Sequence, residues 1–195
     1  MKDILQSIGT LENYFQIATS TGSICSLVGG RLKMTIADVA YSLSNVNSFN
    51  GHLGQYSTAQ HSCLVSDLLG GSYCGLMHDG HEMICGDTST PVKNALNLLG
   101  NNVWKDFEHG IAKRFCHYWG VTFPFPEEVH KADHMARRIE VASLATNEMK
   151  TALRKLGLEP LYNTEFAIQE VWTPDRSFRE FMDRFDKYGP TGRVQ

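Results

Sequence analysis

Helical periodicity interrupted by glycine and proline is the feature that most constrains the fold of this chain. Apolar side chains recur every three or four residues in several segments, and the breaks between those segments are short. Helical patterns cover residues 35–46, 58–69, 72–85, 102–119, 123–149 and 173–189, and Pro91 can open another short helix. Strand-like patterns are scarce, so we predict an all-α, compact helical bundle of about six to eight helices.

The remaining segments carry weaker signals. Residues 1–33 are rich in Ser, Thr and Gly, which indicates an irregular entry or short elements. Residues 47–57 contain turn-forming Asn and Gly and are expected to form a loop. Ser57 or Thr58 is expected to cap the helix that follows, and residues 165–172 are ambiguous.

Size and charge narrow the class of protein. A chain of 195 residues fits a single domain, residues 1–195, that can bury a core without staples. The formal net charge of -3 gives no support for a nucleic-acid partner, since phosphate binding normally needs a basic face. We expect no membrane partner either, because no apolar run is long enough to cross a bilayer and no secretory signal is visible. Five cysteines without a C-x-x-C spacing indicate reduced thiols and a cytoplasmic location.

One short stretch concentrates side chains that bind metals and handle protons. His78 and Glu82 are four residues apart, so a helix would place them on one face, with Asp79 about 100° further round. His61 belongs to the preceding helical pattern, and a Gly-Gly connection should make the two helices antiparallel neighbours. Asp133 is the best candidate for a further ligand from a distant helix, because it lies at the edge of a buried stripe and a buried carboxylate needs a partner.

The residue types indicate a particular class of metal. Two imidazoles and two carboxylates form a mixed nitrogen and oxygen site without thiolates, which argues against a structural zinc. Such a site suits Mn²⁺, Co²⁺, Fe²⁺, Ni²⁺ or Mg²⁺, which activate water and neutralise phosphoryl charge. Glu82 is not needed as a ligand and is placed to hold or deprotonate the attacking water. His81 should point away from His78, toward the surface or behind the metal ligands.

The order of these residues resembles the H…HD…D signature of the HD-domain metal-dependent phosphohydrolases. The segment YSTAQHSCLVSDLL resembles the S-V-x-x-H-S helix of that family. LMHDGHEMICGDTSTPVK resembles the HDxxE…GD…P-x-K block of its small nucleotidase branch. SFNGHLGQYSTAQH is similar to a loop of bacterial and phage members, and together these motifs cover roughly residues 36–140.

The resemblance implies roles for individual residues within an all-α fold that carries a metal site in its core. It implies the metal ligands His61, His78, Asp79 and Asp133, the catalytic residues Glu82 and Asp87, and the substrate-binding residues His52 and Lys93. Family members often carry an Arg just before the F-x-G-H element, where this chain has Ser48. Arg31 or Lys93 would then have to supply that charge, or phosphate binding would rely more on the metal.

The resemblance also implies an activity and partners. Bacterial members are 5′-deoxynucleotidases that act on monophosphates, whereas a phage-encoded relative hydrolyses dATP. The loop and the chain length favour a dATP triphosphohydrolase that releases deoxyadenosine and phosphate, with a divalent ion such as Co²⁺, Mn²⁺ or Mg²⁺. A 5′-deoxynucleotidase, an HD phosphodiesterase and a non-catalytic binding module stay open as alternatives. The expected partners are a small-molecule deoxynucleotide and further copies of the chain, in a dimer or hexamer, in the host cytoplasm if the gene is phage-encoded.

Aromatic side chains offer a wall for a nucleobase. The candidates are Phe49, Tyr56, Trp119, Phe123 and Phe125. Aromatic faces stack on all bases, so base choice has to come from polar groups at the base edge. We predict a preference for deoxynucleotides over ribonucleotides and for adenine over other bases.

Overall fold

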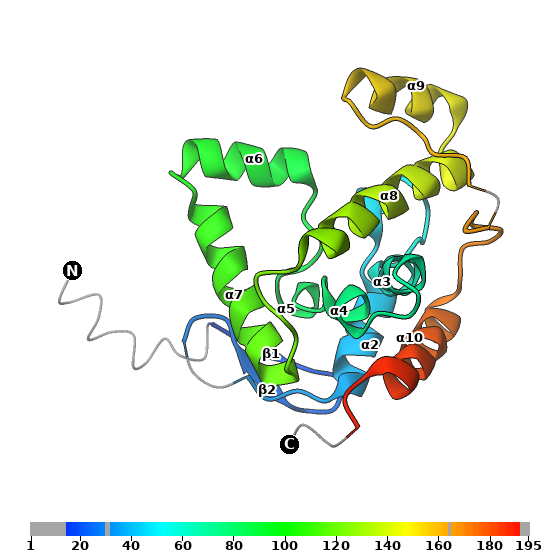
Figure 1. The fold of residues 1–195 in the computed structure, drawn as a ribbon. Coiled ribbons are helices and arrows are strands. Elements are labelled where there is room, and N and C mark those ends of the chain that lie inside the picture. The colour runs from blue at the N-terminus through cyan, green and yellow to red at the C-terminus, as the bar shows by residue number, and fades with distance from the viewer. Residues whose placement is uncertain (1–14, 30–31, 164, 192–195) are drawn as a thin grey trace.

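The computed structural model describes residues 15–29, 32–163 and 165–191, and these are mostly helical (Figure 1). One antiparallel hairpin pairs β1 (Gln16–Ala18) with β2 (Ile24–Ser26). The helices are α2 (Ile36–Asn45), the 3₁₀ helix η2 (Ser48–Gly51), α3 (Thr58–Leu68), α4 (Tyr73–Met77), α5 (Glu82–Cys85), α6 (Thr90–Leu99), α7 (Val103–Trp119), α8 (Glu127–Leu144), α9 (Asn147–Lys155) and α10 (Pro174–Tyr188). The prediction of a mostly helical, all-α fold is confirmed.

Helix α3 lies at the centre of the fold and is surrounded by α2, α4, α8 and α10 (Figure 1). It begins where predicted, because the Ser57 hydroxyl caps it by accepting a hydrogen bond from the Gln60 amide at 3.2 Å. Most of its side chains are buried, polar ones included. Both polar atoms of the Gln60 side-chain amide are hydrogen-bonded: its Nε2 donates to the Glu170 carbonyl oxygen at 3.0 Å, and its Oε1 accepts from the Trp172 backbone amide at 2.9 Å. A helix enclosed in this way holds its side chains in fixed positions, and His61 is one of them.

Two predicted helices are each divided in the structure. The 72–85 pattern forms α4 and α5, separated by a turn at residues 78–81. The 123–149 pattern ends at Leu144, and Thr146 caps α9 by accepting a hydrogen bond from the Met149 amide at 3.2 Å. The described residues therefore contain nine α-helices, from α2 to α10, which is more than the six to eight predicted.

Several peripheral segments complete the described chain. Figure 1 shows α6 and α9 lying away from α3, and neither helix has a buried residue. The ambiguous segment 165–172 forms neither helix nor strand. Among residues 15–29, the predicted irregular entry contains the β1–β2 hairpin, while the rest of that segment lies largely outside the described residues. In the described part of the chain, no helix has the length and apolarity required to cross a bilayer.

Candidate metal centre

His61 projects from α3 and is held from behind by two buried side chains. Its Nδ1 lies 2.6 Å from Oε1 of Glu140, a glutamate on α8 that is completely buried. The hydroxyl of Tyr56 donates a second hydrogen bond to the same oxygen at 3.0 Å. A hydrogen bond from Nδ1–H to a carboxylate fixes the imidazole orientation and directs the Nε2 lone pair forward, as is common for histidines that bind metals.

His78 has the same orientation by a different route. It ends α4, and its Nδ1 lies 2.8 Å from the carbonyl oxygen of Gly75, one turn earlier in the helix. The rings of His61 and His78 have centroids 5.3 Å apart. Nε2 of His78 is buried, and no described residue hydrogen-bonds to it. Two imidazoles therefore present their Nε2 atoms to one small region.

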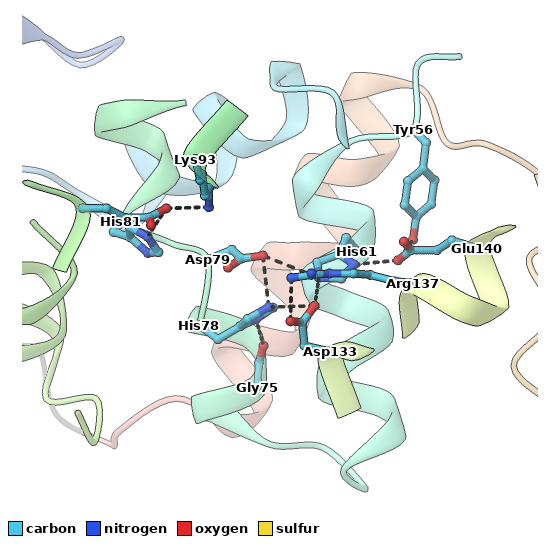
Figure 2. Close-up of polar contacts among 11 residues, drawn as sticks. Tyr56, His61, Gly75, His78, Asp79, His81, Lys93, Asp133, Arg137 and Glu140 are labelled. Atoms are coloured by element: carbon cyan, nitrogen blue, oxygen red, sulfur yellow. Dashed lines mark hydrogen bonds and ion pairs between the residues drawn. The ribbon is translucent and has the colours of Figure 1, made fainter. Parts of the chain in front are cut away.

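Two carboxylates complete this region, one from the turn after α4 and one from α8 (Figure 2). Oδ2 of Asp79 lies 3.0 Å from Nε2 of His78 and 3.5 Å from Nε2 of His61. Oδ1 of Asp133 lies 3.2 and 4.0 Å from the same two nitrogens. Within the described residues, this Oδ1 has no partner that meets hydrogen-bond geometry, while Oδ2 accepts a bond from Arg137 at 2.6 Å.

The donor set fits a divalent cation. His61, His78 and Asp79 bring one ligand atom each to within 4.8 Å of one another, so this buried group could hold a metal ion. Asp133 adds a carboxylate oxygen at comparable range, which gives the mixed nitrogen and oxygen set predicted from sequence. The unsatisfied Nε2 of His78 and Oδ1 of Asp133 are the atoms that such an ion would satisfy, since buried polar atoms normally have partners.

The electrostatics of His61, Asp79 and Asp133 are those of a site that favours positive charge. Burial alone would lower the pKa of His61, but the Glu140 and Asp133 carboxylates hold it well above the ordinary value. Burial alone would raise the pKa values of Asp79 and Asp133, yet the neighbouring imidazoles keep both below their usual range. Both carboxyl groups are therefore ionised at neutral pH, in a site that favours positive charge between them.

Glu82 lies in the first turn of α5 and faces the same region. Its side chain is buried, and Oε2 has no hydrogen-bond partner among the described residues. Burial, together with the carboxylates of Asp79 and Asp87, raises the pKa of Glu82 well above the ordinary value. Asp87 is half-buried, and burial and Asp79 raise its pKa as well. Such a shifted carboxyl group is typical of residues that exchange protons.

Lys93 and His81 both approach Glu108, an acidic residue that the sequence did not single out. The Lys93 ammonium donates to Oε1 of Glu108 on α7 at 2.5 Å, and Nε2 of His81 lies 3.9 Å from the same oxygen. His81 is buried, so its predicted alternative as a surface residue is wrong. Its imidazole lies beside Glu108 of α7, away from His61, His78 and Asp133 (Figure 2).

The loop before α3 has an unusual backbone. Phe49 and Asn50 have φ values of 55° and 52°, in the left-handed region that residues with side chains rarely adopt. The Asn50 amide donates to Ser89 Oγ at 3.3 Å, which joins this loop to the segment after Asp87. Conformations of this kind cluster at functional sites. His52 follows this turn and is exposed, and within the described residues no side-chain hydrogen bond or ion pair joins it to His61, His78, Asp79 or Asp133.

Residues that could supply the phosphate-binding cation expected near Ser48 lie elsewhere in the structure. Ser48 is buried, and its amide donates to the Tyr56 carbonyl oxygen at 2.9 Å. Arg31 lies outside the described residues. Arg137, on α8, lies beside Asp133 and close enough to Asp79 and Asp87 for them to raise its pKa, although burial alone would lower it. Asp79, Glu82, Asp87 and Asp133 form an acidic cluster. Arg137 and Lys93 are the cations that the structure places next to it.

The predicted aromatic wall is only partly present. Tyr56 is fully buried against Glu140 and Trp119 is buried in the main core, so neither can stack on a nucleobase. Phe125 meets the His78 ring edge-on at a centroid distance of 6.4 Å, and Phe123 packs against Phe125 at 5.3 Å. Phe49 packs against a smaller core cluster next to Tyr56. Of the five candidates, Phe125 therefore lies against His78, with Phe123 packed beside it.

Two cavities, of about 420 and 270 Å³, lie away from His61, His78, Asp79 and Asp133. The first lies between the β1 segment and α2, and the second between α3 and residues 165–176. Neither is lined by a metal-ligand candidate. The candidate metal centre is therefore defined by the convergence of donor atoms, and not by the size of a cavity.

Comparison with known proteins gives relatives without an assigned activity. No protein-family model matches the chain. The uncharacterized protein YfdR of Escherichia coli is 44% identical over 66 residues, which cover 32% of this chain and 37% of that protein. An uncharacterized protein of Rhodobacter capsulatus is 28% identical over 126 residues, 58% of this chain and 64% of that protein. The chain thus spans less than two thirds of the length of either relative.

Proposed function

We propose that this protein is a divalent-metal-dependent phosphohydrolase that acts on a deoxynucleotide. The observation that carries the proposal is the convergence of His61, His78, Asp79 and Asp133 from three separate segments. Their donor atoms face one another, and two of those atoms are buried without a hydrogen-bond partner among the described residues. The resemblance of the same residues, in the same order, to the HD-domain signature supports the choice of phosphate chemistry.

The residues around this centre supply what phosphate hydrolysis requires. A divalent ion held by the four ligands would lower the pKa of a bound water and offset charge on the phosphoryl group. Oε2 of Glu82 has no hydrogen-bond partner among the described residues and is available to the attacking water, and a raised pKa makes the Glu82 carboxylate a stronger base for a proton of that water. Glu140 keeps His61 in the tautomer that presents Nε2.

The phosphate side of the site is provided by Lys93 and Arg137. Lys93 lies on the α6 side of the acidic cluster and Arg137 on the α8 side, so a phosphate chain can lie between them (Figure 2). Asp79 and Asp133 are the partly accessible members of the site, with side-chain exposures of 21% and 15%. A substrate would therefore approach the centre past these two carboxylates, and the family resemblance implies that Asp87 lies close to the metal or the sugar–phosphate.

Within this proposal, dATP is the preferred substrate. The support is the resemblance of the 48–61 loop to phage members and the small number of basic residues, which disfavours a longer polyanion. A colorimetric phosphate assay across deoxynucleoside mono-, di- and triphosphates with Mn²⁺, Co²⁺ or Mg²⁺ tests this. Phosphate from monophosphates alone would identify a 5′-deoxynucleotidase, and a nucleotide product from cyclic dinucleotides would identify a phosphodiesterase. If the protein hydrolyses none of these compounds, the remaining alternative is a non-catalytic binding module.

Discrimination against ribose is a separate expectation. A 2′-hydroxyl packed against apolar side chains such as Phe123 and Phe125 loses its hydrogen bonds to water, which costs about 1–3 kcal/mol. We therefore expect dATP to be hydrolysed at least about tenfold faster than ATP, since 1.4 kcal/mol is a factor of ten. Competition among dATP, dGTP, dAMP and ATP, resolved by chromatography, measures this. Equal rates for ATP and dATP would contradict the sugar preference, and faster hydrolysis of dGTP would contradict the base preference.

A further inference from the structure

Glu108 contacts side chains from two other segments that border the site. It lies on α7, and its Oε1 is 2.5 Å from Nζ of Lys93 on α6 and 3.9 Å from Nε2 of His81 in the turn before α5. The three side chains are mostly sheltered, with exposures of 21%, 25% and 8%. No sequence motif draws attention to Glu108, and the catalytic chemistry proposed above does not use it.

Lys93 needs support because its own helix gives it little. None of the α6 residues is buried, so α6 provides no core packing to fix the lysine. A lysine side chain also has many rotamers, and that freedom must be lost when its ammonium is held in one place. Helix α7, in contrast, is anchored by the buried residues Ile111, Phe115 and Cys116. A carboxylate on the well-packed helix α7 can therefore hold the flexible Lys93 side chain in one position.

Held by Glu108, the Lys93 ammonium is close enough to the proposed catalytic centre to interact with its carboxylates. The Lys93 ammonium interacts electrostatically with Glu82 and Asp79, which belong to the proposed catalytic centre. An ammonium has three donor hydrogens, and the bond to Glu108 occupies one of them. The others remain for phosphate oxygens.

We infer that Glu108 is a positioning residue, which holds Lys93 over the metal centre so that its ammonium receives the phosphates of a deoxynucleotide. The inference rests on the proposed function and adds to it the residue that orders the phosphate-binding cation. A competing arrangement predicts the opposite effect of removing Glu108 on substrate binding. If Glu108 only competed with phosphate for Lys93, its removal would strengthen substrate binding.

Two substitutions at Glu108 separate these arrangements. Glu108→Gln keeps an oxygen that can accept from Lys93, while Glu108→Ala removes it. If Glu108 positions Lys93, the Ala variant should lose about tenfold in kcat/KM for dATP, equivalent to 1.4 kcal/mol, mainly through a higher KM, and the Gln variant should recover most of the loss. In a Lys93→Met background, Glu108→Ala should have no further effect, because the group it positions is gone.

The experiment is steady-state kinetics on the metal-loaded protein, with metal content and thermal unfolding measured for every variant. Glu127→Ala is the matched control, because Glu127 forms a similar 2.8 Å pair with Lys131 on the exposed surface. A wild-type or improved kcat/KM in Glu108→Ala, or an additive loss in the double variant, would overturn this inference alone. A wild-type protein that neither hydrolyses nor binds any nucleotide would overturn the proposed function and this inference with it.

Discussion

Asp79→Ala is expected to abolish both metal binding and turnover while the helices remain folded. Asp79 contributes the carboxylate oxygen that lies 3.0 Å from His78, and an alanine leaves no ligand atom in its place. The fold should survive because the Asp79 backbone carbonyl, not its side chain, accepts the hydrogen bond from the Glu82 amide at 2.9 Å. Loading with Mn²⁺, gel filtration and elemental analysis measure the bound metal, and circular dichroism measures helix content.

The control for this substitution is Asp183→Ala, which removes an exposed carboxylate on α10. It should keep wild-type metal content and rate. Full metal content and full rate in Asp79→Ala would remove Asp79 from the site. Loss of helical signal in that variant would be addressed with Asp79→Asn, which keeps the shape of the side chain and removes its charge.

Glu82→Ala should separate metal binding from catalysis. In the proposed mechanism this carboxylate handles a proton without binding the ion, so the variant should keep substantial metal and substrate binding. Its kcat should fall by about 10²-fold or more, the usual scale for a positioned acid or base. Glu82→Gln should show a similar loss, since an amide of the same size cannot accept the proton. A variant with wild-type kcat would show that the attacking water needs no help from Glu82.

The sequence predicted the elements whose signals are local. Helix α3 has its Ser57 cap, a helical run and a glycine pair at its end, and each of these acts within a few residues. The break at residues 78–81 has no such signal, because His78 and His81 keep nearly helical backbone angles. Glycine is required in this turn for a tertiary reason, since a Cβ at Gly80 would lie 2.3 Å from the Phe115 ring on α7. Only the position of α7 reveals that constraint.

The supporting residues of the site were harder to predict than the ligand candidates. Glu140 lies seven residues after Asp133, with Arg137 between them, so all three share one face of α8. That spacing could have identified Glu140, because a glutamate on a buried face needs a partner. Glu108 offers no comparable signal, since its partners lie on other elements and meet it only after α6 and α7 pack together.

The decisive measurement is phosphate release from dATP by metal-stripped protein as Mn²⁺ is titrated in. If His61, His78, Asp79 and Asp133 form a catalytic metal centre, the stripped protein should release no phosphate. Its rate should then rise with added Mn²⁺ and reach a plateau near one ion per chain. The His61→Ala variant should stay inactive across the same titration. Phosphate release at full rate without metal, or wild-type behaviour of His61→Ala, would contradict the assignment of these residues as a catalytic metal site.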